Sequence, residues 1–513
     1  MPTGSTPKAS QSSVLVTKNS TQSTNLATDM PLRGNDKFMG KMEWPQVDVA
    51  HAPRALRGLA SIIEEGLCHR CGTCVGICPT EVLGTDQAEY PTVKNLSACT
   101  DCDLCVKVCP GDSFDVRRAH NEVFSTEADL DSTHGSFSKA VIAHSTCDEV
   151  RKNSTSGGLV TAILLHLLEV GKIDGAVVIG SDEDVLWKGK PIVARTRAEL
   201  LAAMKSKYAI SPTNSMLGEI RKLDGKFALV GLPCQIHGFV NAANLDKRIK
   251  DRIVLTIGLF CHAAIEHTAF EIVWDSLGAK RDEAVRFVSR IGKHPGAPHI
   301  ELKDGTLHPV YFGDKKGFRP SSMELINVLY RLYTPNRCLL CFDALSEFAD
   351  ISVGDPWMSP PNDDVDFKQG WSMALLRTER GVSAYEELVS HKKLESVDLS
   401  EAEAYSCNRH MSAEKRSRAF RVIEKYRRQG KAIPWYGGPE TKLPKLSLLS
   451  LIKAEINLFT HIFCFAHRFR ASVLKFFLGN GGYPLLWLNN KRKRFKVWVR
   501  DKVFRIRKTY GRK

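Results

Sequence analysis

Two four-cysteine runs of one pattern constrain this chain more than any other feature. They read Cys68-His-Arg-Cys71-Gly-Thr-Cys74-Val-Gly-Ile-Cys78-Pro79 and Cys99-Thr-Asp-Cys102-Asp-Leu-Cys105-Val-Lys-Val-Cys109-Pro110. Each follows the C-x2-C-x2-C-x3-C-P spacing that binds [4Fe–4S] clusters, in which the fourth cysteine of one run ligates the cluster of the other run. We therefore expect one cluster on Cys68, Cys71, Cys74 and Cys109, and a second on Cys99, Cys102, Cys105 and Cys78.

The alternative for such cysteines is zinc, which usually takes four ligands from separated pairs of Cys or His. Two repeated four-cysteine runs do not follow that arrangement. We expect residues 58–118 to form a ferredoxin-like module with two [4Fe–4S] clusters. Because such clusters transfer single electrons, the rest of the chain should contain the group that uses those electrons.

The length and the N-terminal segment indicate what kind of protein carries this module. A chain of 513 residues with 43% hydrophobic residues predicts a soluble protein of several domains. Residues 1–50 begin with a Ser/Thr-rich stretch that lacks acids and has no apolar secretory core, which predicts disorder. An organellar transit peptide is the alternative, although the first 28 residues contain no Arg. We expect a cytoplasmic protein with reduced cysteines.

Alternating helix and strand patterns follow the module. Apolar residues recur at helical spacing from Leu159 onward, with Ser154 or Ser156 as the expected cap and Gly171 as the expected end. Short β-like runs cover residues 173–179, 227–230, 253–257 and 349–353, and Asp304-Gly305 predicts a tight primed hairpin turn. These patterns predict a sheet covered by helices.

Two of these β-like runs end in the same way. Gly231-Leu-Pro-Cys234 follows one run, and Gly258-Leu-Phe-Cys261 follows the next. If the two strands are parallel, both cysteines emerge at the carboxyl edge of the sheet, where open α/β sheets place their ligands.

Several motifs occur in one order in this body: Asn153-Ser-Thr-Ser-Gly-Gly-Leu159, Lys205-Ser-Lys-Tyr208, Gly-Leu-Pro-Cys-Gln235, Gly-Leu-Phe-Cys261, Arg337-Cys-Leu-Leu-Cys341, and Ala349-Asp-Ile-Ser-Val-Gly-Asp355. Behind a two-cluster module, this order resembles the beta-subunit family of coenzyme F420 hydrogenases and dehydrogenases, which includes 7-hydroxymethyl chlorophyll a reductase. The resemblance covers roughly residues 60–400 and implies an N-terminal family domain at 136–225 and a C-terminal one at 226–400. Thr155 departs from the family motif, where Gln is expected.

The resemblance implies a bound FAD. Ser156, Gly157 and Gly158 would expose backbone N–H groups to its pyrophosphate at a helix start, and Lys207 would add a compensating charge. The alternative is that Ser-Gly-Gly is only a cap and a turn. The expected fold is of α+β and α/β type: the ferredoxin-like module, a mixed α/β flavin-binding body and a basic amphipathic helical tail.

Four further cysteines predict a possible third [4Fe–4S] cluster: Cys234, Cys261, Cys338 and Cys341. A redox-active dithiol or buried structural cysteines are the alternatives. The catalytic residues are otherwise unknown, and His237 and His262 are candidates for donating protons because they lie close to Cys234 and Cys261 in the sequence.

The basic charge is concentrated in the tail, residues 440–513. Residues 441–513 hold 18 Lys and Arg against Glu455 and Asp501, whereas the whole chain has a net charge of +15. Apolar and aromatic residues are interspersed, but no uncharged stretch reaches the 20 or so residues of a spanning helix. We expect peripheral contact with an anionic membrane surface, with an acidic protein, RNA or solvent as alternatives; no specific nucleic acid is expected.

The predicted function is an oxidoreductase that passes electrons between a carrier, ferredoxin or reduced coenzyme F420, and an organic substrate through clusters and FAD. The alternatives are an electron-relay subunit of a larger redox complex and a non-catalytic iron–sulfur binding module.

Overall fold

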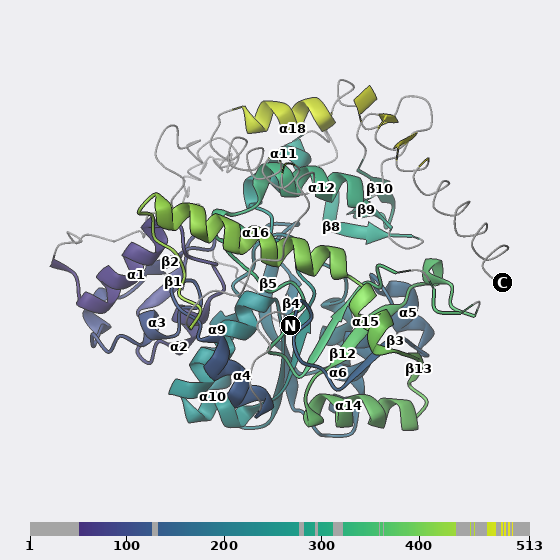
Figure 1. The fold of residues 1–513 in the computed structure, drawn as a ribbon, viewed down its shortest axis with the longest axis horizontal. Helices are drawn as coiled ribbons and strands as arrows, with labels where there is room; N and C mark the ends of the chain where they lie inside the picture. The colour runs from purple at the N-terminus through teal and green to yellow at the C-terminus, as the bar shows by residue number, and fades with distance from the viewer. Residues whose placement is uncertain are drawn as a thin grey trace, which may run out of the picture. The chain divides into compact units, whose positions relative to one another are not determined.

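The computed structural model describes residues 51–125, 132–275, 282–292, 296–310, 322–358, 360–362, 364–437 and 469–478, with isolated positions of the tail (Figure 1). The segment 1–50 and most of the basic tail, 440–513, lie outside the described residues, so the disorder and amphipathic-helix predictions made for them remain predictions.

The cysteine-rich module is built from short elements around its own core. Leu56, Leu59 and Ile63 of its first helix are buried against Val82 and Cys105. The antiparallel pair β1 and β2 separates the two cysteine runs. The elements are α1 (Arg54–Glu64), α2 (Thr73–Ile77), β1 (Leu83–Thr85), β2 (Pro91–Val93), α3 (Leu104–Lys107) and α4 (Val116–Phe124).

The body is organised by an eight-stranded sheet of order β13-β3-β12-β11-β7-β6-β4-β5. The pairs β11–β7, β7–β6 and β6–β4 are parallel, and the remaining pairs are antiparallel. This confirms the predicted mixed α/β sheet. Its strands are β3 (Lys139–Ser145), β4 (Gly175–Ser181), β5 (Gly189–Ala194), β6 (Phe227–Gly231), β7 (Ile253–Leu259), β11 (Ile351–Gly354), β12 (Ser372–Leu376) and β13 (Leu394–Leu399).

Both faces of this sheet are covered by helices. Along β6, Phe227 and Leu229 enter one core and Ala228 enters the other, because successive side chains of a strand point to opposite faces. One face packs against α8 (Leu217–Ile220), α9 (Pro233–Leu245) and α10 (Lys247–Arg252); the other packs against α6 (Leu159–Glu169), α7 (Arg197–Ala202) and α14 (Glu379–Ser390). The short helix α5 (Asp148–Asn153) precedes α6.

A second, three-stranded antiparallel sheet has the order β10-β9-β8. It packs against α11 (His267–Asp275), α12 (Ser322–Tyr333) and α18 (Arg470–Leu478), whose Leu474 and Leu478 are buried in a shared core. The strands are β8 (Ala284–Ile291), β9 (Ala297–Leu302) and β10 (Leu307–Pro309). The predicted hairpin forms, since β9 and β10 pair, but only Gly305 of the Asp304-Gly305 pair has a positive φ. The prediction of a primed turn was wrong, because such a turn needs a positive φ at Asp304.

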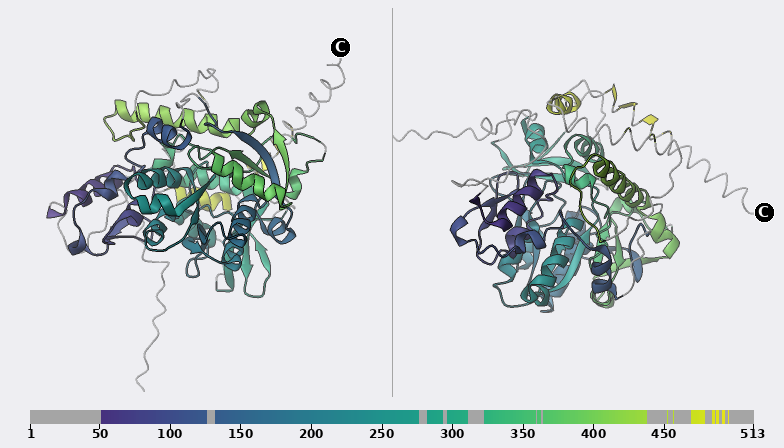
Figure 2. Two further views of the ribbon diagram at one scale, coloured as in Figure 1. Left: turned by 90° about the horizontal axis from the view of Figure 1, so that it is seen from below. Right: turned by 60° about the vertical axis from the view of Figure 1, so that its left-hand side comes forward.

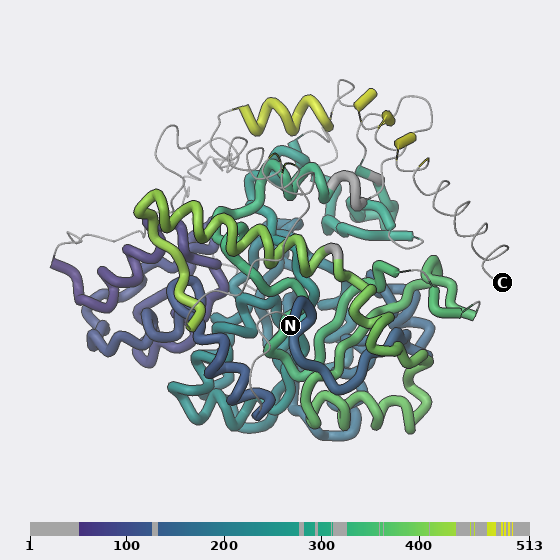
Figure 3. Tube along the Cα trace, viewed as in Figure 1, coloured from purple at the N-terminus to yellow at the C-terminus, as the bar shows by residue number. Residues whose placement is uncertain are grey.

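The long helix α16 (Arg409–Arg428) begins over the body and ends beside the ferredoxin-like module, as the chain trace also shows (Figures 2 and 3). Its Ala419, Phe420 and Ile423 share a core with Cys109 and Phe114 of the module. The helices α13 (Asn336–Leu339) and α15 (Glu401–Ser406) lie before it in the chain. Among the described residues, no helix is long and apolar enough to cross a membrane.

Candidate iron–sulfur centres

The first thiol set joins the start of one cysteine run to the end of the other. Cys71, Cys74 and Cys109 are buried, and Cys68 is half-buried. Burial raises the pKa of the Cys74 thiol well above its ordinary value, and the thiols of Cys68, Cys71 and Cys109 raise it further. Because charges act strongly only over short distances, the four cysteines predicted for one cluster lie near one another, and Cys105 of the second run is also close.

The second thiol set contains the fourth cysteine of the first run. Burial raises the pKa of the Cys105 thiol to about 12, and the thiols of Cys78, Cys102 and Cys99 contribute in that order. Cys78 therefore groups with the second run, as the exchange of fourth cysteines requires. Cys102 is exposed to solvent, whereas the first set is mostly buried.

The backbone turns in the same way in both runs. Arg70 and Asp101, each two residues after the first cysteine of its run, have φ of 58° and 53°. Gly72 and Asp103, two residues later, have φ of 82° and 61°. Left-handed conformations at matched positions curl each loop so that its N–H groups converge, and the Arg70 N–H donates to the Cys68 sulfur at 3.3 Å.

The first loop is fixed to the body by Asn214. The Asn214 backbone N–H donates to the Cys71 carbonyl at 3.0 Å, and its side-chain amide donates to Thr73 Oγ1 at 2.9 Å and to the Gln235 carbonyl at 2.7 Å. A Cβ at Gly72 would lie 2.5 Å from the Pro212 carbonyl oxygen, so glycine allows this close contact. The loop of Cys71 is thereby held next to the residue that follows Cys234.

The third thiol set lies where β6 and β7 end. Gly231 and Gly258 are register partners on these parallel strands, which confirms the expected shared edge, and each is followed three residues later by Cys234 or Cys261. Burial raises the pKa of the Cys234 thiol, and other thiols raise it further, in the order Cys71, Cys261, Cys341 and Cys338. The four cysteines considered for a third cluster thus share one location, and Cys71 of the first set is their neighbour.

Arg337 connects the third set to the first. Its guanidinium is buried and donates to the carbonyls of Pro110 and Gly111, at 3.1 and 3.2 Å, and to the Tyr436 hydroxyl at 3.1 Å. Since Arg337 precedes Cys338 and Pro110 follows Cys109, this side chain fixes the distance between two cysteine loops. Arg337 could be singled out from the sequence, because it opens the Arg-Cys-Leu-Leu-Cys motif. No sequence pattern indicated the role of Asn214.

The spacing of these thiols differs from that of a single-ion site. Among the described residues, no group of three or more His, Cys, Asp and Glu side chains lies close enough to hold one metal ion. Zinc draws its four ligands to within about 2.3 Å of one atom, whereas a cubane holds its thiolates around a larger body. It is the two repeated four-cysteine runs that favour clusters over zinc.

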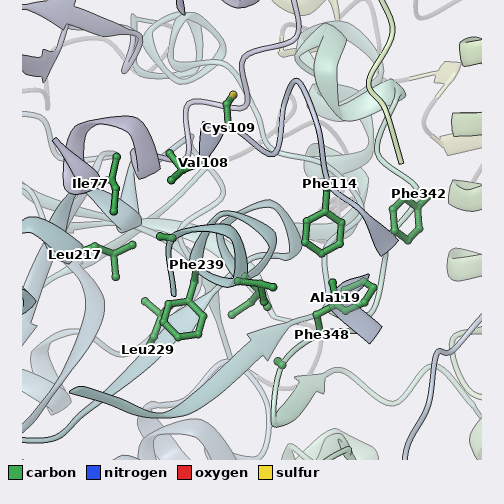
Figure 4. Close-up of a cluster of buried hydrophobic side chains, with 14 of the residues drawn as sticks. Ile77, Val108, Cys109, Phe114, Ala119, Leu217, Leu229, Phe239, Phe342 and Phe348 are labelled. Atoms are coloured by element: carbon green, nitrogen blue, oxygen red, sulfur yellow. The ribbon is translucent and has the colours of Figure 1, made fainter. Parts of the chain in front are cut away.

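The candidate proton donors lie in unlike surroundings. His237 is buried, its Nε2 lies 3.0 Å from Asp343 Oδ2, and its ring stacks on Phe114 at 4.0 Å between centroids. Phe114 also packs edge to face against Phe348, with ring centroids 4.9 Å apart. Figure 4 shows both rings in this core. His237 is therefore enclosed by core residues, and its role as a proton donor stays a prediction. His262 is half-buried, with its ring 5.4 Å from that of Tyr330.

The residues predicted to bind FAD form hydrogen bonds within the protein. The Gly157 N–H donates to Ser372 Oγ at 3.0 Å, and the Ser156 hydroxyl donates to the Trp371 carbonyl. A Cβ on Gly157 would lie 2.4 Å from the Ala143 carbonyl oxygen, so this glycine is needed for packing against a strand. The N-cap of α6 is Gly158, with φ of 76°, so the predicted caps at Ser154 and Ser156 were wrong; Gly171 does follow the helix end with φ of 70°.

The Lys207 side chain is likewise hydrogen-bonded within the protein. Its ammonium donates to the carbonyls of Ala203 and Met204, at 2.7 and 3.1 Å, just beyond the end of α7. The cavity that it lines with Trp187 and Arg286 measures about 20 Å³, which is room for little more than one water. A cofactor pocket measures about 300 Å³ or more, and these residues do not form one in the described part of the chain. The fit to FAD at this place is poor.

Family models match three parts of the chain. The beta subunit of coenzyme F420 hydrogenase/dehydrogenase matches at residues 140–218 by its N-terminal part and at 224–402 by its C-terminal part. A 4Fe–4S dicluster domain matches at residues 60–110.

Curated relatives are similar at moderate identity. The coenzyme F420-dependent sulfite reductase of Methanocaldococcus jannaschii is 30% identical over 67% of this chain and 49% of its own length, so the chain spans about half of that protein. The coenzyme F420 hydrogenase subunit beta of Methanothermobacter thermautotrophicus is 27% identical over 59% of this chain and 99% of the subunit. In the solved F420-reducing [NiFe] hydrogenase complex from Methanosarcina barkeri, one chain aligns with a TM-score of 0.46 and 26% identity, over 60% of this chain and 98% of that one.

Proposed function

This chain belongs to the coenzyme F420 hydrogenase/dehydrogenase beta-subunit family, and we propose that it is an iron–sulfur oxidoreductase that passes electrons between a carrier and an organic substrate. The carrier is reduced coenzyme F420 or ferredoxin. The relatives named as F420-dependent enzymes or subunits support an oxidoreductase. The chain would carry three [4Fe–4S] clusters, one on each thiol set.

The observation that carries this proposal is the hydrogen bonding of Asn214 to loops of both the first and third thiol sets. Asn214 binds the Cys71 carbonyl and the carbonyl of Gln235, next to Cys234, and Cys71 is the thiol that raises the pKa of Cys234 most. On the other side, Cys105 of the second set acts on Cys74 of the first. We infer that the three sets follow one another in the order second, first and third. A single electron could enter near exposed Cys102 and reach the body, or leave by the same path.

Burial suits the inner two sets to electron transfer. The Cys109 thiol has its pKa raised to about 12 by burial, and the same cause raises that of Cys261 to about 12. Thiols in such surroundings bind iron only as thiolates, so cluster assembly must displace their protons. Excluding water also keeps the clusters from hydrolysis, while Asn214 and Arg337 hold the loops at fixed separation.

FAD would convert two-electron chemistry into the single-electron steps of the clusters. The family resemblance supports its presence, whereas the placement of Ser156, Gly157, Gly158 and Lys207 does not, because their polar groups bind the protein. We therefore propose FAD on the resemblance alone and assign no residue to it.

A relay subunit is the second candidate, because one relative is a subunit of a hydrogenase. Such a subunit would transfer electrons to a separate catalytic partner. We also propose that the basic tail contacts an anionic membrane surface, because it mixes basic and aromatic residues.

Stopped-flow mixing tests the proposal. The anaerobically purified chain is mixed with reduced F420 or with reduced ferredoxin, and cluster absorbance is followed. Reduction of the clusters by one carrier supports the oxidoreductase. Reduction with no turnover of any added acceptor, unless a partner subunit is present, supports the relay. An inert protein with no flavin supports the non-catalytic module.

A further inference from the structure

Two basic side chains share one side of α16, near the third thiol set, Cys234, Cys261, Cys338 and Cys341. Lys415 and Arg418 are three residues apart and so lie on one side of the helix. Lys415 is only 2% exposed, and its Nζ donates to the Cys261 carbonyl oxygen at 2.8 Å. Helix α16 also packs against α13, which contains Cys338.

The guanidinium of Arg418 has donors without acceptors. Its Nε and Nη2 atoms are buried and make no hydrogen bond within the described part of the chain. Buried donor atoms without partners are costly, so the Nε and Nη2 atoms indicate an acceptor at this place. Burial lowers the pKa of Arg418, and the groups that oppose this most are the thiols of Cys338 and Cys341, ahead of Glu414 and Cys261.

The buried carboxylates nearby are engaged elsewhere. Asp343 accepts hydrogen bonds from His237 and from the backbone N–H groups of Leu345 and Glu347. The Glu347 carboxylate binds the Arg416 guanidinium with both oxygens, at 2.8 and 2.9 Å. Glu414 is exposed. Buried Lys415 and partly buried Arg418 thus share the side of α16 that packs against the third thiol set, where an anionic group bound by those thiols would balance their charge.

We propose that Lys415 and Arg418 form the cationic wall of a [4Fe–4S] cluster on the third thiol set, and that Arg418 donates hydrogen bonds to its sulfur atoms. This inference rests on the proposed function, which supplies the third cluster. Nothing in the family match assigns these residues, because the match ends at residue 402, before α16 begins.

The proposal implies that the third cluster has a higher reduction potential than the cluster on the second thiol set. Reduction adds one negative charge, which nearby cations and N–H···S hydrogen bonds stabilise. Around the second set, Cys102 is exposed and lies between Asp101 and Asp103. An electron given up by a reduced cluster of the module would therefore move toward the third cluster, oxidising the former and reducing the latter, and Lys415 and Arg418 tune this step.

The test uses the anaerobically purified full chain and three substitutions on α16. Arg418→Gln removes the charge, Arg418→Lys keeps it, and Arg428→Gln makes the same change at an exposed position of the same helix, where the side chain is 77% exposed. Iron content is measured for each protein, and redox titration followed by electron paramagnetic resonance gives the midpoint potential of each cluster.

We expect Arg418→Gln to lower only the third potential, shifting the electron equilibrium between first and third clusters by about tenfold, or about 59 mV for one electron. Arg418→Lys should recover part of the shift, and Arg428→Gln should cause none. If Arg418→Gln loses four iron atoms and Arg418→Lys regains them, the charge requirement is also supported. Equal potentials in Arg418→Gln and Arg428→Gln, or loss of the cluster in both Arg418 variants, would overturn the inference. Wild-type protein with only two clusters would instead refute the third cluster itself.

Discussion

Arg70 and Glu266 form a two-pronged ion pair between the first cysteine run and the body. Arg70 Nη1 donates to Oε2 at 2.8 Å and Nη2 donates to Oε1 at 2.6 Å, and the two side chains are 2% and 17% exposed. The Tyr90 ring lies 4.5 Å from the guanidinium carbon. The pair links the module to the segment before α11, so it should stabilise their mutual position.

We predict that Glu266→Gln lowers the free energy of unfolding by about 3–5 kcal/mol, because it leaves a buried guanidinium without its counter-charge. The double variant Arg70→Met/Glu266→Gln should lose less than the two single variants together. Denaturant unfolding measures these changes. Arg197→Gln, which breaks exposed ion pairs with Glu149 and Glu169, is the control and should have a much smaller effect. Equal unfolding midpoints for Glu266→Gln and the control would contradict the prediction.

Gly157→Ala should destabilise the fold through contact alone. The added Cβ would lie 2.4 Å from the Ala143 carbonyl oxygen and 2.7 Å from the Ser372 nitrogen, and neither backbone atom can yield easily. We expect a loss at the upper end of the 1–3 kcal/mol or so that overpacking costs. Gly171→Ala is the matched control, since Gly171 has a positive φ but no atom within 4 Å of the added Cβ. A smaller loss for Gly157→Ala than for Gly171→Ala would refute packing as the reason for this glycine.

The sequence predicted the elements and the grouping of residues better than their contacts. The β-like runs at 227–230 and 253–257 became β6 and β7, because short apolar runs followed by glycine are typical of buried parallel strands. The shared edge of Cys234 and Cys261 followed from that. The Ser-Gly-Gly motif was interpreted as a ligand site, but Gly157 packs against β3 and Ser156 binds the Trp371 carbonyl, more than 200 residues away in sequence. A hydrogen-bond acceptor so far away in the sequence cannot be predicted from the residues around the motif.

The exchange of fourth cysteines predicts which variants share a defect. Cys78→Ala and Cys105→Ala should remove the same paramagnetic signal, although Cys78 belongs to the first run, because both thiols lie in the second set. Cys109→Ala should remove a different signal together with Cys74→Ala. Spectra of the reduced variants decide this. Loss of one signal by Cys78→Ala together with Cys74→Ala, rather than with Cys105→Ala, would show that each run holds its own cluster.

Lys207 predicts a pH dependence of stability. Burial, with a smaller contribution from Arg286, lowers its pKa from 10.5 to about 7. Between these two values the unfolded chain holds more protons at this site than the folded chain, so stability should rise as the pH increases from about 7 toward 10.5. Lys207→Met should remove this rise. Unfolding at pH 7 and pH 9 measures it, and an unchanged pH slope in the variant would exclude Lys207 as its cause.

The basic residues at the third thiol set could not be predicted from the sequence. Lys415 and Arg418 lie in a helix of many charged residues, whose composition is typical of a solvated surface. The packing of α16 against α13 and of its apolar residues in the core turns this side of the helix inward. Arg337 could have been found from its motif, whereas Lys415 lies 154 residues from its acceptor at Cys261.

Iron and acid-labile sulfide analysis of the anaerobically purified chain tests the central claim most directly, with Cys338→Ser/Cys341→Ser as the comparison. Three clusters predict about 12 Fe per chain in the wild type and about 8 Fe in the double variant. About 8 Fe in both would contradict the account, because Cys234, Cys261, Cys338 and Cys341 would then hold no cluster and the path from the module would end at the first thiol set.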